Sequence, residues 1–154
     1  MELIDYALDI EINGLIERNL FEDLEQITKL HKERVAQEKY VPIAKKYANI
    51  LIGIKERLEK LNQRKINVSD VVLWVNANIS TAELNKLGAL FDGIRNQISF
   101  GLRGLSASIW NGYSDINSAL SLIYTANEIN VNPETRKNLI DAKNQLLELK
   151  QKLS

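Results

Sequence analysis

The sequence contains no cysteine, a single histidine and only two prolines among 154 residues. Without cysteine, a disulfide scaffold, a thiolate nucleophile and every cysteine-ligated zinc or iron–sulfur site are excluded. Long apolar runs are missing too. The longest uncharged interior stretches, at 71–82, 104–114 and 116–127, hold about a dozen residues each, whereas a membrane-spanning helix needs roughly 20. We therefore expect no membrane segment.

A secretory start is also missing from the first residues. Glu2, Asp5 and Asp9 stand where a signal peptide would carry basic and then apolar residues. Together with the absence of cysteine, this predicts a cytoplasmic protein. Twenty Lys and Arg balance twenty Asp and Glu, so the total charge indicates no polyanionic partner.

What the sequence does contain is apolar spacing typical of α-helices along nearly its whole length. One helix is expected at about 20–38. A second is expected to begin at Pro42, because proline suits the first turn of a helix, and to end near Arg64. The last helix has Asn132 as its N-cap and a heptad-like seam over 133–153 (Leu139, Ala142, Leu146, Leu149, Leu153).

The longest apolar stripe covers 84–127. As one helix it would be roughly 65 Å long at about 1.5 Å per residue, too long for a domain of this size. We expect an interruption where glycine enters the pattern, at 100–104 or at 111–115, where Ser114 is suited to cap a new helix. The alternative role for Gly101 and Gly104 is a close helix contact. Ser80 to Glu83 matches a capping box.

The remaining segments complete an all-α prediction. Residues 71–75 fit either a short helix capped by Ser69 or a buried strand. Near the N-terminus, an amphipathic helix weakens at Asn13-Gly14, and a strand ending in a hairpin turn is the alternative. The fold class we predict is an all-α single-domain bundle of five or six helices over 1–154, with a long interrupted central helical region.

Chemical motifs are few. Residues 9–14 partly match a calcium loop, but Leu20 stands where the loop needs a bidentate Glu. His31 has Thr28 where a helical Glu-x-x-His metal pair would need Glu. No serine-nucleophile or phosphate-loop motif occurs. We therefore expect no catalytic residue, no cofactor and no metal site, and hence a protein that is not an enzyme.

Charge is unevenly distributed along the chain. Only eight charged residues occur in the 67 residues from 66 to 132 (Asp70, Glu83, Lys86, Asp92, Arg95, Arg103, Asp115, Glu128). Either these helices are buried at the centre of the bundle, or their outer face is a low-charge surface that meets a partner. Of the two explanations the sequence favours burial. If the face is instead an interface, Trp110, Tyr113 and Tyr124 are its candidate contact residues, because interfaces deplete charges and enrich aromatics.

The function predicted from these features is a non-enzymatic helical module, an adaptor, regulator or inhibitor, that docks the low-charge face of the 81–130 helices on a protein partner. The alternative is a nucleic-acid-binding accessory subunit that uses a basic helix face (Lys45, Lys46, Lys55, Arg64, Lys65), although acidic residues interleave with it and make nucleic acid the weaker expectation. The 133–153 helix is also a possible homodimer contact.

Overall fold

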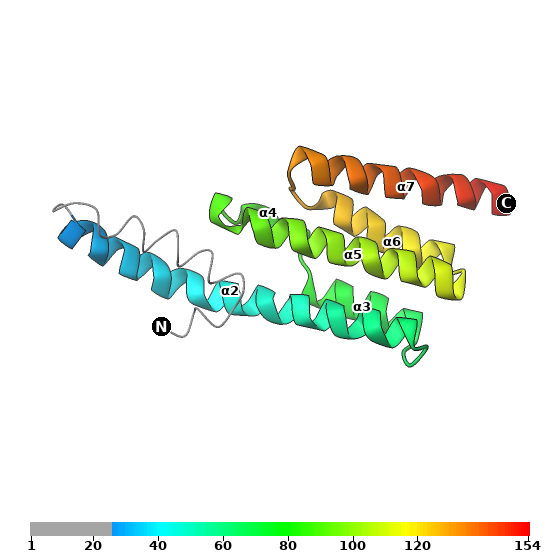
Figure 1. Ribbon diagram of the computed structural model, residues 1–154, viewed down its shortest axis with the longest axis horizontal. Helices are drawn as coiled ribbons and strands as arrows, with labels where there is room; N and C mark the ends of the chain where they lie inside the picture. Colours follow the sequence, from blue (N-terminus) through cyan, green and yellow to red (C-terminus); the bar gives the residue numbers. More distant parts are fainter. Residues whose placement is uncertain (1–25) are drawn as a thin grey trace. The chain divides into compact units, whose positions relative to one another are not determined.

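The computed structural model describes residues 26–154, with side chains from residue 38 onward. The helices of this range are, in order, α2 (Gln26–Asn62), α3 (Val68–Asn78), α4 (Thr81–Lys86), the short 3-10 helix η2 (Ala89–Phe91), α5 (Asp92–Tyr113), α6 (Ile116–Glu128) and α7 (Pro133–Leu153) (Figure 1). No strand occurs in this range. The all-α prediction is confirmed, and the strand alternative for 71–75 is wrong because these residues lie in α3. The partial calcium-loop match at 9–14 and the Asn13-Gly14 turn lie outside the described residues, as does the side chain of His31.

The contacts of the chain group into two units, Met1–Asn49 and Ile50–Ser154. The prediction of one domain over 1–154 stays a prediction. In the first unit, the described side chains of Ala44 and Tyr47 are buried, and the Lys46 ammonium lies 5.4 Å from the centroid of the Tyr47 ring.

Pro42 lies inside α2, so the predicted helix boundary at Pro42 is wrong. A proline in a helix interior removes one backbone hydrogen bond and typically costs about 3 kcal/mol or more. The carbonyl left without a helical partner is that of Glu38, four residues earlier. Pro42 and Glu38 are both exposed, so water can hydrogen-bond to this carbonyl and reduce the cost. The following part of α2 ends at Asn62, close to the predicted end near Arg64.

In the unit Ile50–Ser154, α3 packs on the C-terminal part of α2 through a glycine. Gly53 of α2 faces Trp74 of α3 so closely that a Cβ atom on Gly53 would overlap the indole ring. The Arg57 guanidinium lies 3.9 Å from the centroid of that ring, and its Nη1 donates to the Gly53 carbonyl at 3.0 Å. The absence of a side chain at Gly53 therefore sets how closely the two helices approach.

The same part of α2 packs against α5 through Gly101 and Gly104. A Cβ atom on Gly101 would lie 2.9 Å from Cγ2 of Ile54, and one on Gly104 would lie 3.9 Å from Cδ2 of Leu58. Because both residue numbers increase together, the two helices run parallel. The predicted break at 100–104 is wrong, since α5 is continuous there, and the alternative of a close helix contact is confirmed.

The interruption predicted at 111–115 is confirmed. α5 ends at Tyr113, Ser114 adopts the left-handed conformation with φ 54°, and α6 begins at Ile116. Asp115 caps α6, because its Oδ1 accepts a hydrogen bond from the Ser118 backbone N–H at 3.1 Å. The prediction that Ser114 is the cap is wrong: Ser114 ends α5 in the left-handed conformation, and the N-cap position of α6 falls one residue later, at Asp115, whose carboxylate accepts from the free N–H group.

The other predicted caps have mixed outcomes. The Ser80 hydroxyl accepts from the Glu83 backbone N–H at 3.2 Å, and Asn132 Oδ1 accepts from the Thr135 N–H at 2.7 Å, so both N-caps are confirmed. The prediction of Ser69 as a cap is wrong, because α3 begins one residue earlier, at Val68, and its N-cap position is Asn67.

The core of the second unit lies among α5, α6 and α7. In Figure 1, α6 runs antiparallel to α5, and α7 returns parallel to α5. The predicted stripe over 84–127 forms most of this core, and the following of its members are buried: Leu84, Phe91, Ile94, Ile98, Leu102, Leu105, Ile109, Leu120 and Ile123. From α7, Leu139 and Leu146 of the predicted seam are also buried. No helix of the described range is long and apolar enough to cross a bilayer.

Candidate functional site

Within the low-charge region, α6 is largely buried and α5 is half exposed. α6 lies centrally and contacts α3, α5 and α7. Of its thirteen residues only Asn117, Tyr124 and Glu128 are exposed, so burial explains why α6 carries so little charge. α5 instead buries one face and leaves the opposite face open to solvent. Burial therefore does not explain the scarcity of charge on that open face.

The open face of α5 follows helical spacing. Its exposed residues step by three or four positions, and we call this set the α5 outer face (Gln97, Phe100, Arg103, Ala107, Asn111). Phe100 is 42% exposed, unusually open for an aromatic side chain. Arg103 is the single charge of this face. Polar amides and apolar groups make up the rest, so little charge would have to be desolvated when another surface covers it.

Beside this face, a groove runs between α5 and α7. Its volume is about 180 Å³, and its lining, which defines the Trp110 groove, consists of Arg103, Ser106, Ala107, Trp110, Asn111, Ile123, Ala142, Gln145, Leu146 and Leu149. Ile123 and Leu146 are buried and form the apolar floor. Among the described residues of this lining, Arg103 alone is charged. The groove and the α5 outer face share Arg103, Ala107 and Asn111, so they form one continuous surface.

The three aromatic residues predicted for a partner surface have different surroundings. Trp110 lines the groove. The Tyr113 hydroxyl donates to the carbonyl oxygens of Leu61 at 3.1 Å and Ile66 at 3.4 Å. Tyr124 is 44% exposed, on α6. Tyr113 therefore links the end of α5 to the α2–α3 connection, and no hydrogen bond or ring contact joins the three within the described residues.

Sequence reasoning missed Phe100, Arg103 and Ala107. All three fall between the positions of the buried stripe, at the spacing of a second helical face. That spacing was the available signal. The spacing alone does not distinguish an ordinary solvated helix face from a low-charge face beside a groove. That distinction requires knowing which helices pack against α5.

Asparagine side chains supply a third reason for the low charge of 66–132. Asn85 of α4 donates to the Glu128 carbonyl at 2.9 Å and accepts from the Asn130 backbone N–H at 2.7 Å. Asn96 of α5 accepts from the Asn132 N–H at 3.2 Å. An amide both donates and accepts, so one Asn can satisfy an N–H and a C=O at once. These residues fix the α6–α7 connection to α4 and α5.

Two arginines complete this polar framework. Arg95 is 5% exposed; its Nη1 donates to the carbonyls of Leu84 at 3.1 Å and Leu87 at 2.7 Å, and its Nη2 pairs with Asp92. Arg136 donates to the Asn127 and Ile129 carbonyls. The cavity of about 170 Å³ beside Arg95 is lined by the same framework (Asp92, Arg95, Asn96, Asn130, Val131, Asn132). The polar groups that line this cavity belong to the framework that fixes the loops, so we assign the cavity no ligand.

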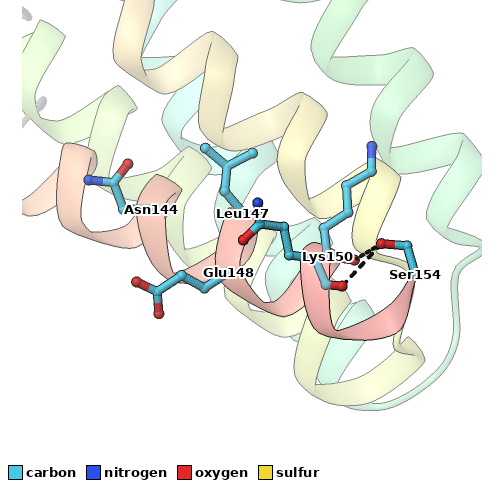
Figure 2. Close-up of a pocket in the computed structure, with 6 residues that line it drawn as sticks. Asn144, Leu147, Glu148, Lys150 and Ser154 are labelled. Atoms are coloured by element: carbon cyan, nitrogen blue, oxygen red, sulfur yellow. Dashed lines mark hydrogen bonds between the residues drawn. The ribbon is translucent and has the colours of Figure 1, made fainter.

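A wider hollow lies at the end of α7. Its described lining comes from that helix alone, with a volume of about 560 Å³ (Asn144, Leu147, Glu148, Lys150, Gln151, Ser154) (Figure 2). The Ser154 hydroxyl donates to the Lys150 carbonyl at 3.3 Å and the Gln151 carbonyl at 3.0 Å. One carboxylate and one ammonium on a single exposed helix provide neither a metal site nor an acid–base pair.

The basic residues of the alternative function are all exposed (Lys45, Lys46, Lys55, Arg64, Lys65). Lys45 and Lys46 belong to the first unit and the others to the second. The Arg64 guanidinium lies 5.5 Å from the centroid of the Tyr113 ring. Glu56 and Glu59 are exposed on the same helix as Lys55, so acidic groups interrupt the basic face. Burial lowers the pKa of Arg57, an effect that Glu56 partly offsets.

Side chains suited to chemistry are scattered. Among the described residues, no three His, Asp or Glu side chains gather as metal ligands would. The buried Ser106 hydroxyl donates to the Ala119 carbonyl at 2.7 Å, and the buried Ser99 hydroxyl has no hydrogen-bond partner within the described part of the chain. Comparison with protein-family models, curated proteins and solved structures gives no match. The site of interest is thus a surface, the α5 outer face with the Trp110 groove.

Proposed function

We propose that the protein is a non-enzymatic helical interaction module, an adaptor, regulator or inhibitor, that docks the α5 outer face and the Trp110 groove on a protein partner in the cytoplasm. The observation that carries the proposal is an exposed helix face with one charge beside an apolar groove. Charged residues are depleted at the centres of protein interfaces, whereas aromatic residues and arginine are enriched. Phe100, Arg103 and Trp110 provide that combination within three helical turns.

The neighbouring faces support the choice of this surface. α7 presents Glu134, Lys137 and Asp141 to solvent, and the second-unit part of α2 presents Lys55, Glu56 and Glu59. A partner covering either helix would have to desolvate several charges. Covering α5 between residues 96 and 113 desolvates Arg103 alone.

A paired-variant capture experiment tests the proposal. Phe100→Ser combined with Ala107→Glu changes two exposed positions of α5, so we expect the circular dichroism spectrum to stay helical while partner capture from the native source is lost. Leu73→Ser is the matched control, because Leu73 is an exposed apolar residue (65%) on α3. Capture that survives the α5 variant, or is lost equally with Leu73→Ser, would contradict the proposal.

Trp110 needs a separate variant because it is only partly exposed. Trp110→Ala enlarges the groove, and we expect weaker capture with retained helicity. A loss of helicity would instead identify Trp110 as a packing residue.

Two further expectations are tested independently. The homodimer contact through 133–153 has Ile140 (39% exposed) and Leu153 (63% exposed) available, since Leu139 and Leu146 pack inside the unit. Light scattering at several concentrations gives the molar mass that decides it. For the nucleic-acid alternative, retention on an anionic column should fall steeply with salt.

A further inference from the structure

Four of the five arginines in 38–154 interact with a ring or a backbone carbonyl of the same chain. Arg57 stacks on Trp74, Arg64 lies over Tyr113, and Arg95 and Arg136 donate to backbone carbonyls. Arg103 makes no hydrogen bond, ion pair or ring contact with any described residue, and it is exposed at the Trp110 groove. A guanidinium with five donors, standing free above an apolar floor, is suited to an acceptor supplied from outside.

The rest of the groove lining adds hydrogen-bond donors to the positive charge of Arg103. Its other polar groups are the Ser106 hydroxyl, the Trp110 indole N–H and the amides of Asn111 and Gln145, and no carboxylate occurs among the described residues of the lining. Ser106 already bonds to a carbonyl. The groove thus carries a positive charge and hydrogen-bond donors around its rim, which complements a negatively charged partner.

The buried part of the groove is mostly apolar, with the Ser106 hydroxyl bonded to the Ala119 carbonyl, and it is of side-chain size. The groove holds about 180 Å³ between the buried side chains of Ile123 and Leu146 and the ring of Trp110. An apolar cavity of about 150 Å³ accommodates benzene. One Leu, Met or Phe side chain therefore fits the groove.

We propose that the Trp110 groove binds an acidic amphipathic helix of the partner: one apolar side chain enters the groove, and an Asp or Glu about one turn away pairs with Arg103. This inference rests on the proposed function and names the partner's chemistry. Because α5 and α7 run parallel, a helix can lie along the groove, as in other helix-in-groove complexes (Figure 1). Phe100, one turn before Arg103, then meets the helix beside the groove. A phosphorylated segment fits less well because phosphate recognition typically uses clusters of arginines.

A displayed library of helical peptides tests this chemistry. Peptides of about 16 residues on an Ala/Gln scaffold, with one helix face randomised, are selected on the full chain. We expect enriched peptides to carry an apolar residue with Asp or Glu three or four positions away. Binding should shift the indole N–H resonance of Trp110. That of Trp74, the other of the two tryptophans, is the internal reference and should stay fixed.

Arginine variants separate charge from packing. Because hydrogen bonds to charged groups are among the stronger ones, Arg103→Gln should weaken the selected peptides about tenfold or more, and Arg103→Lys should recover part of the loss. Arg64→Gln is the matched control, an exposed arginine outside the groove, and should change the affinity less than about twofold.

Three results would overturn the inference: no enriched peptide, enriched peptides without an acidic residue, or affinities that Arg103→Gln leaves unchanged. The proposed function has its own outcome. If native capture requires Phe100 and Ala107 but peptide binding does not require Arg103, only the partner chemistry is wrong. If peptides require Arg103 while native capture ignores the α5 variant, the proposed function is wrong.

Discussion

Gly53 gives the sharpest test of how the second unit is packed. A Cβ atom placed there would overlap Cζ2 of Trp74 and lie 2.9 Å from Cη2. The ring is rigid, and the Arg57 guanidinium stacks on it at 3.9 Å. Gly53→Ala must therefore displace α3 or disrupt the stack, although alanine is the better helix former.

Whether Gly53→Ala stabilises or destabilises the protein depends on whether the gain in helix propensity or the cost of overpacking is larger. Replacing glycine by alanine in a helix interior stabilises by about 1 kcal/mol. Overpacking a tight contact costs about 1–3 kcal/mol. Gly104→Ala is the matched control, because its nearest atom would be 3.9 Å away, an ordinary contact. We expect Gly104→Ala to stabilise by up to about 1 kcal/mol and Gly53→Ala to destabilise by up to about 2 kcal/mol.

Urea unfolding followed by far-ultraviolet circular dichroism measures the free energy of unfolding of both variants. In thermal unfolding, their melting temperatures should differ by about 2–4 °C for each kcal/mol. A double-mutant cycle isolates the cause. In a Trp74→Leu background the overlap is removed, so Gly53→Ala should then stabilise. If Gly53→Ala stabilises the unchanged chain as much as Gly104→Ala does, the packing argument is refuted.

Two further predictions concern polar links. Tyr113→Phe removes the hydroxyl that donates to Leu61 and Ile66, so it should lower the free energy of unfolding by about 1 kcal/mol with unchanged helicity; no loss in denaturant titration would show that water replaces the link. Arg95→Met leaves the Leu87 carbonyl without its 2.7 Å donor and should cost roughly 1–3 kcal/mol in the same assay, with Arg95→Lys recovering only part because it lacks the guanidinium fork. A neutral Arg95→Met would mean that the carbonyl is solvated.

Much of this fold was predictable because helices bury one stripe of residues. The spacing over 84–127 predicted the buried apolar residues of α5 and two of those of α6, Leu120 and Ile123. Ser80 and Asn132 marked helix starts by local chemistry. The helix boundary predicted at Pro42 was wrong for a physical reason. Its cost depends on whether the carbonyl of Glu38 reaches water, and that exposure is a property of the folded chain.

The glycines also show that local sequence does not decide where a helix is interrupted. Gly101 was equally compatible with a helix break and with a close contact, and only the position of Ile54 decides between them. The turn that does end α5 uses Ser114 in a left-handed conformation, which serine adopts less readily than glycine. Local propensity therefore predicted that the long stripe must be interrupted but not which of the two sites interrupts it.

The candidate site was only partly predictable, because scarcity of charge has three different origins in 66–132. In α6 the cause is burial. Around Asn85 and Asn96 it is the need for side chains that both donate and accept to fix the loops. On the α5 outer face neither cause applies, since Phe100 and Ala107 are exposed and bond to nothing that would require an uncharged residue. This third case leaves a surface that a partner can cover at low desolvation cost. The composition of the segment indicates a docking surface only after the residues accounted for by the first two causes are set aside.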